Sequence, residues 1–133
     1  MNKSDIIEAL LNYGDEEYDH YGMPVFRIDG CEYAIGTDEE ADEAVKENIK
    51  ESVWAFNAEF LAGYIAGGEL TADDINRLRG DRCEDCNEAL LKLIDDFDDF
   101  VEGAVSSDGR GHFLSPYDGE EIEEGDYYLY RVN

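Results

Sequence analysis

The stretch LLKLIDDFDDFVEG, residues 90–103, combines an apolar stripe with a run of four aspartates. The apolar residues recur at helical spacing: Leu90, Ile94, Phe97 and Val101. They fall within about 40° of one another on a helical wheel of 100° per residue. This pattern predicts one helix from about residue 83 to residue 105. Aspartate is a mediocre helix former, and like charges four residues apart destabilise a helix, so the aspartates require an explanation.

The solvent face of this predicted helix consists almost entirely of carboxylates. The wheel places together Glu88, Asp95, Asp99 and Glu102, with Asp96 and Asp98 beside them. A second helix is predicted over residues 38–56, because Thr37-Asp38-Glu39-Glu40 has the pattern of a capping box. Its predicted apolar face holds Ala41, Val45, Ile49, Ser52 and Phe56. Its predicted outer face holds Glu40, Glu43, Glu47 and Glu51.

The charge of the chain is extreme for its length. The 133 residues include 35 acidic and 10 basic residues, a net charge of −25, far beyond the few units that solubility requires. Hydrophobic residues make up 43%, which argues against a wholly disordered acidic chain. We therefore expect a folded protein that binds neither nucleic acid nor an anionic membrane surface directly, and whose natural partner is strongly basic. We also expect no signal peptide and no membrane span.

The rest of the chain predicts one compact α+β domain over residues 1–133, with central helices and short antiparallel strands near both ends. Ser4 is expected to cap a helix over residues 4–13, and residues 14–24 read as a loop. Asp29-Gly30 suits a tight hairpin turn between two strands over residues 25–37. Thr71 is expected to cap a short helix. The tail predicts two or three strands, with turns at Asp118-Gly119 and Gly125-Asp126.

No motif in the sequence predicts catalysis, so we expect no enzyme activity and no cofactor. Cys83 and Cys86 have the CxxC spacing of half a zinc site, and Cys31 with one histidine can complete a four-ligand set. Two thiols near a helix start are the simpler interpretation, and an odd count of three cysteines indicates reduced thiols in the cytoplasm. The loop from Asp108 to His112 lacks the lysine of a phosphate-binding loop. It is read as a glycine turn into a strand, with Arg110 and His112 as possible contact residues.

Tyrosines concentrate outside the predicted helices. In the YYLY ending, strand alternation puts Tyr128 and Tyr130 on one face and Tyr127 and Leu129 on the other. Tyrosine is favoured at interfaces. The ending therefore has two readings: a core face with hydroxyls at its rim, or a tyrosine-rich docking surface.

The segments EYAIGTDEEADEAVKENIKESVWAFNAEFLAGY and SSDGRGHFLSPYDGEE, with the YYLYRVN ending, resemble small uncharacterised proteins of tailed bacteriophages. The resemblance covers most of residues 32–133 and implies a viral origin. The chain is also similar, in size and charge alone, to phage anti-restriction DNA mimics and anti-CRISPR inhibitors. That similarity assigns a role to no residue.

These observations predict a phage-encoded inhibitor that acts in the host cytoplasm. It would occupy a basic nucleic-acid-binding groove of a host defence or DNA-handling complex by mimicking DNA. The expected contact residues are Glu40, Glu43, Glu47, Glu51, Asp95, Asp98, Asp99 and Glu102. Three alternatives remain: an adaptor or inhibitor that docks through the tyrosine-rich strands, a small zinc-binding protein, and a salt-adapted surface. A dimer would lengthen either charged row.

Overall fold

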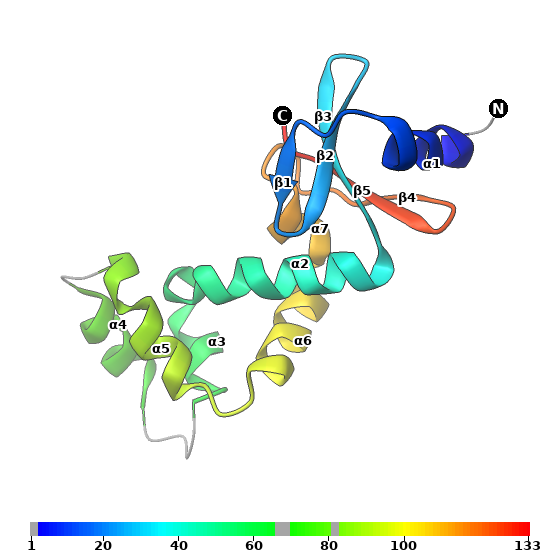
Figure 1. The fold of residues 1–133 in the computed structure, drawn as a ribbon. Coiled ribbons are helices and arrows are strands. Elements are labelled where there is room, and N and C mark those ends of the chain that lie inside the picture. Colours follow the sequence, from blue (N-terminus) through cyan, green and yellow to red (C-terminus); the bar gives the residue numbers. More distant parts are fainter. Residues whose placement is uncertain (1–2, 66–69, 81–82) are drawn as a thin grey trace. The chain divides into compact units, whose positions relative to one another are not determined.

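A computed structural model describes residues 3–65, 70–80 and 83–133, without the side chains of residues 83 and 84. The chain divides into two compact units (Figure 1). The sheet unit comprises Met1–Asn48 and Val105–Asn133, and the helical unit comprises Ile49–Ala104. Helices together with an antiparallel sheet confirm the α+β class. The expectation that residues 1–133 form one domain stays a prediction.

The sheet unit holds a five-stranded antiparallel sheet in the order β1-β2-β3-β5-β4. Its elements are α1 (Lys3–Tyr13), β1 (Tyr18–His20), β2 (Met23–Ile28), β3 (Cys31–Thr37), most of α2 (Asp38–Glu51), the end of α6 (Phe97–Asp108), α7 (Arg110–Leu114), β4 (Ile122–Glu124) and β5 (Tyr127–Arg131). Strand β5 lies between β3 and β4, with Ile35 opposite Leu129. The carboxyl-terminal strand thus completes a sheet that begins near the amino terminus.

The hairpin between β2 and β3 confirms the turn expected at Asp29-Gly30. Both residues have positive φ, 51° and 82°, as the two central residues of a type I′ turn require. Ile28 pairs with Cys31 across this turn. The turn fixes the register, and the register sends Phe26 and Ile35 to one face of the sheet.

One face of the sheet packs against α1 and forms the core of this unit. Its buried members are Ile7, Phe26, Ile35 and Leu129, with Tyr127 packed against them. Tyr130 is also fully buried, and strand alternation places it on the opposite face from Leu129. The alternation expected for YYLY is therefore confirmed, and both of its faces contribute to packing.

The helical unit is built from short helices. They are the end of α2, the 3-10 helix η1 (Val53–Ala55), α3 (Ala58–Ala62), α4 (Ala72–Gly80), the 3-10 helix η3 (Cys83–Cys86), α5 (Asn87–Leu93) and most of α6. Asn57 caps α3 by accepting the backbone N–H groups of Glu59 and Phe60. Thr71 caps α4 as expected, with its Oγ1 accepting the N–H of Asp74.

Three expectations about local structure are wrong. The 14–24 loop contains β1, whose backbone pairs with β2. The helix expected over 38–56 ends at Glu51, because the Asn87 side chain binds the carbonyl of Lys50 and the N–H of Trp54. The turn expected to lead from residue 108 into a strand leads into α7 instead, after Gly109 with φ 84°.

The largest error concerns the helix expected over residues 83–105. It is interrupted between Leu93 and Phe97, where Ile94 is extended and forms a β-bridge with Ile65. The N–H of Asp95 donates to the carbonyl of Tyr64 at 3.1 Å. These contacts come from a segment about 30 residues earlier in the chain. Helical periodicity cannot predict them, because it describes only neighbours within the same helix.

Candidate functional site

Helix α2 presents the expected acidic face. Its 14 residues include seven acidic and two basic residues, so its net charge is −5. Ala41, Val45 and Ile49 are buried on one side of the helix. The four predicted contact residues are exposed on the other side: Glu40, Glu43, Glu47 and Glu51. Because the helix is continuous from Asp38 to Glu51, these carboxylates form one row.

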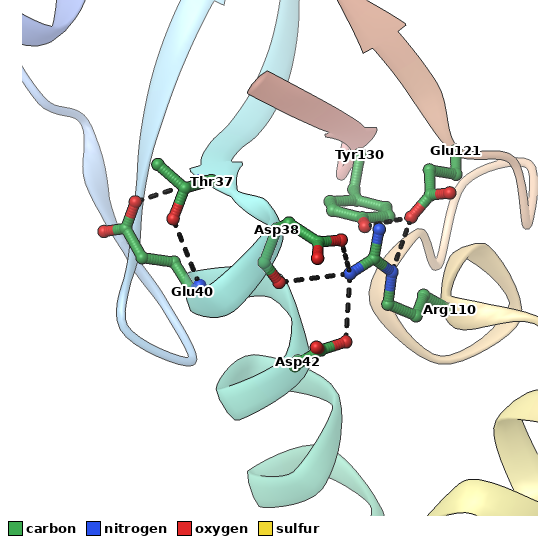
Figure 2. Close-up of polar contacts among 7 residues, drawn as sticks. All are labelled: Thr37, Asp38, Glu40, Asp42, Arg110, Glu121 and Tyr130. Carbon is green, nitrogen blue, oxygen red and sulfur yellow. Dashed lines mark hydrogen bonds and ion pairs between the residues drawn. The ribbon is translucent and has the colours of Figure 1, made fainter. Parts of the chain in front are cut away.

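The start of this row also stabilises the helix itself. The Glu40 carboxylate accepts the backbone N–H of Thr37 at 2.9 Å. In return, the backbone N–H of Glu40 donates to Oγ1 of Thr37 at 3.2 Å (Figure 2). This reciprocal capping box confirms the sequence pattern. Glu40 therefore serves the fold as well as the charged surface, whereas Glu43 and Glu47 lie beyond the cap.

Arg110 is the centre of a polar cluster at the same end of α2 (Figure 2). Its Nη1 donates to Oδ1 of Asp38 at 2.8 Å and to Oδ1 of Asp42 at 3.0 Å. Its Nε donates to Oε1 of Glu121 at 2.8 Å, and that oxygen also accepts the hydroxyl of Tyr130. The Arg110 side chain is only 11% exposed. The cluster ties α7, α2 and the segment before β4 together, so Arg110 acts as a structural residue and not as the exposed contact residue considered above.

Tyr130 is the fully buried member of this polar cluster. Burial, followed by the hydrogen bond to Glu121, raises the pKa of Tyr130 far above its ordinary value. The phenol therefore stays protonated and remains a donor to Glu121. Tyr128, on the same strand face, lies under the guanidinium of Arg110, 4.6 Å from the ring centroid.

Three other arginines, Arg27, Arg79 and Arg131, also make contacts within the protein. Arg79 donates from Nη1 to the carbonyls of Trp54 and Phe56. Arg131 lies over the ring of Tyr117 at 3.7 Å, and Arg27 pairs with carboxylates on neighbouring segments. These three arginines therefore contribute to contacts between segments of the protein.

The second predicted row does not form as expected. Asp98, Asp99 and Glu102 lie on α6, but Asp95 lies before that helix begins and Glu88 lies on α5. All five are exposed. Their expected alignment on one helix face is wrong, because the chain is extended at Ile94.

The aspartate run marks the start of α6. Oδ1 of Asp96 accepts the backbone N–H of Asp99 at 3.1 Å, and its carbonyl accepts the N–H of Phe100. Asp96 is therefore the N-cap of α6. Asp98 and Asp99 occupy its first turn, where the helix dipole favours negative charge. Part of the run is thus structural. The sequence contained a pattern that predicts this cap: Asp96 lies three residues before Asp99, at the start of an apolar run.

The tyrosine-rich strand is mostly covered. Tyr130 is fully buried, and Tyr127 and Tyr128 are half-buried. The tyrosines with large exposed fractions lie elsewhere, with Tyr13 at 89% and Tyr117 at 57%. The structure therefore does not present the YYLY strand as an open docking face.

The remaining candidate ligands are dispersed. Cys31 is half-buried and Cys86 is buried, while the side chain of Cys83 lies outside the described residues. Within the described residues, no group of three or more histidine, cysteine or acidic side chains is placed to hold a metal ion. His20 bonds through Nε2 to the carbonyl of Leu114 at 2.9 Å, which is a structural role. No helix in the described ranges is long and apolar enough to cross a membrane.

Comparison of the chain with models of known protein families, with curated proteins and with solved structures found no match.

Proposed function

We propose that this protein is a phage-encoded inhibitor that binds a basic nucleic-acid-binding groove of a host protein or complex in the host cytoplasm. A defence complex of the restriction or CRISPR type is the expected class of target. It acts by occupying the groove and excluding DNA, without catalysis or a cofactor. The observation that carries the proposal is the continuous row of exposed carboxylates on α2.

The spacing of this row suits a groove built for phosphates. Residues four apart on a helix are about 6 Å apart along its axis, which is close to two phosphate steps of about 3.4 Å along one strand of a duplex. Lysine and arginine side chains that bind phosphates can also bind carboxylates through charge-assisted hydrogen bonds. Association would then release counterions and weaken steeply with salt.

Affinity capture from a bacterial lysate tests this proposal. The protein is immobilised at about 50 mM salt, and bound proteins are eluted in steps to about 200 mM and above. We expect a nucleic-acid-binding protein or complex that elutes within this range and is displaced by added DNA. A partner that stays bound at high salt and is not displaced by DNA contradicts mimicry. A broad mixture of basic proteins shows that the negative charge binds basic proteins non-specifically, which also contradicts the proposal.

A matched pair of variants locates the contact surface. Glu43→Lys with Glu47→Lys reverses the middle of the α2 row without touching its capping box. Asp15→Lys with Glu16→Lys makes the same change in net charge on an exposed segment outside α2. We expect the first pair to weaken binding at least about tenfold and the second pair to have a much smaller effect. Equal losses in both pairs contradict a specific role for α2.

The alternatives carry less support. Docking through the tyrosine-rich strand is disfavoured because Tyr130 is buried and Tyr127 packs in the core. A zinc-binding role for Cys31, Cys83 and Cys86 stays a prediction, tested by a zinc assay on freshly purified protein. A salt-adapted surface fits the wide spread of the charge, since the sheet unit carries a net −16 and the helical unit a net −9. It predicts no specific partner in the capture experiment.

A further inference from the structure

Five aromatic side chains from two stretches of the helical unit, residues 56–64 and 97–100, converge on one another. Their ring centroids lie between 4.9 and 6.2 Å apart in the pairs that touch. The members of this aromatic cluster are Phe56, Phe60, Tyr64, Phe97 and Phe100. Phe100 is fully buried, and the other four rings surround it half-buried. The cluster is therefore a small core with part of its aromatic surface in contact with solvent.

Backbone contacts hold these rings in place. The Asn57 side chain caps α3, which carries Phe60. The N–H of Asp95 bonds to the carbonyl of Tyr64, and a β-bridge joins the neighbouring residues Ile65 and Ile94. A side chain at Gly103 would begin 2.1 Å from the hydroxyl of Tyr64. The absence of a side chain at Gly103 therefore lets Tyr64 lie against α6.

Exposed carboxylates neighbour the half-buried rings along the chain. At 100° per residue, Asp98 and Asp99 lie about 130° to either side of the centre of the α6 face that carries Phe97 and Phe100. Glu59 immediately precedes Phe60 on α3, and all three carboxylates are exposed. The helical unit contains 14 acidic and 5 basic residues. Aromatic surface beside excess negative charge is complementary to a cation with a flat, weakly hydrated head.

Arginine is that cation. In the sheet unit, Arg110 and Arg131 each lie over a tyrosine ring, at 4.6 and 3.7 Å. Among the described residues of the helical unit, no cation lies over Phe60 or Phe97 in this way. Guanidinium groups stack on aromatic rings and bind carboxylates through two parallel hydrogen bonds, whereas a lysine ammonium is a compact, strongly hydrated charge.

We propose that the aromatic cluster and its adjoining carboxylates form a contact surface for an arginine-bearing segment of a protein partner. It includes none of the residues of the α2 row. The proposal shares with the proposed function the premise of a basic partner, but it adds a preference for arginine over lysine that charge alone does not supply.

Calorimetric titration with capped octa-arginine and octa-lysine peptides tests the inference. We expect the intact protein to bind the arginine peptide about three- to tenfold more tightly, which corresponds to one or two stacked guanidinium groups. Phe60→Leu with Phe97→Leu should reduce this ratio while leaving the affinity for octa-lysine unchanged. Leu78→Ala, an exposed apolar change on α4, is the control and should leave the ratio intact.

The outcome separates this inference from the proposed function. Glu43→Lys with Glu47→Lys should lower the affinity for both peptides and leave the ratio of the two affinities unchanged. A failure of the α2 proposal therefore appears in the absolute affinities and not in their ratio. A ratio that is the same in the intact protein and in the folded phenylalanine variant overturns the inference. If that variant does not fold, the ring-proton NMR signals of Phe60 and Phe97 in the intact protein decide. They should shift with octa-arginine and not with octa-lysine, and equal shifts overturn the inference.

Discussion

Replacement of Asp96 by alanine distinguishes the N-cap of α6 from a site within a continuous helix. The Asp96 side chain accepts the N–H of Asp99 at 3.1 Å, and loss of an N-cap acceptor costs about 1 kcal/mol, within about 0.5–2 kcal/mol. In a continuous helix the sign reverses, because alanine is the better helix former and one of four neighbouring negative charges disappears. The direction of the change in unfolding free energy therefore decides between the two structures.

Urea unfolding followed by tryptophan fluorescence measures this change. Trp54 is the only tryptophan in the chain and lies in the helical unit, so its emission reports on the unit that contains Asp96. For a unit of this size we take a denaturant slope of about 1 kcal/mol/M. Asp96→Ala should then lower the unfolding midpoint by about 1 M urea.

Asp96→Asn is the matched control, because it removes the same charge and keeps an acceptor oxygen. Asparagine and aspartate are about equal as N-caps, so its midpoint should stay close to that of the unchanged protein. A higher midpoint for Asp96→Ala, or the same shift in both variants, would refute the capping argument. Repulsion within the aspartate run would then be the larger effect.

Three further predictions follow from the polar contacts and the net charge. Arg110→Met should destabilise the sheet unit by about 1–2 kcal/mol, measured by near-ultraviolet circular dichroism of its tyrosines. Glu121, Asp38 and Asp42 then lose a charged donor, as does the backbone carbonyl of Asp38, which accepts from Nη1 of Arg110 at 3.1 Å. Arg110→Lys should restore only part of this, since lysine lacks the planar fork. The hydrogen bonds from the backbone and then the hydroxyl of Thr71 hold the pKa of Asp74 below 3.8, so the stability that they provide is present above that pH and is lost as pH falls through the lowered pKa. An NMR titration should show this midpoint moving part of the way back towards 3.8 in Thr71→Val, which keeps the backbone N–H, and an unchanged midpoint contradicts the contribution of the hydroxyl. Sodium chloride should raise the melting temperature, because screening relieves repulsion at a net charge of −25. The rise should be smaller in Glu43→Lys with Glu47→Lys, and a fall would show that ion pairs outweigh the repulsion.

Where the chain makes its own local contacts, sequence patterns predicted the structure closely. Asp29-Gly30 formed the hairpin, because both residues adopt positive φ readily. Thr37 and Glu40 formed the capping box, because the two partners are three residues apart along the chain. The acidic face of α2 followed from helical periodicity within one continuous helix.

The positions of the acidic contact residues were predicted correctly only where the predicted helix is continuous in the structure. Glu43 and Glu47 lie where the helical wheel placed them. Asp95 does not, because the backbone of the 64–65 segment pairs with Ile94 and Asp95 and draws them out of a helix. The aromatic cluster was not predicted, since it combines residues from two stretches about 35 residues apart.

The sequence by itself determined the α+β class, the negative charge, the hairpin, the caps of α2 and α4 and the row on α2, because these depend on residue type and on neighbours within one or two turns. Tertiary structure decided where α2 ends, where the aspartate helix divides and what Arg110 does. In each case a side chain or backbone group from a distant segment supplies a hydrogen bond: Asn87 to the end of α2, Tyr64 to Asp95, and Glu121 to Arg110. Such partners are brought together only by the folding of the whole unit, and buried polar groups must find them.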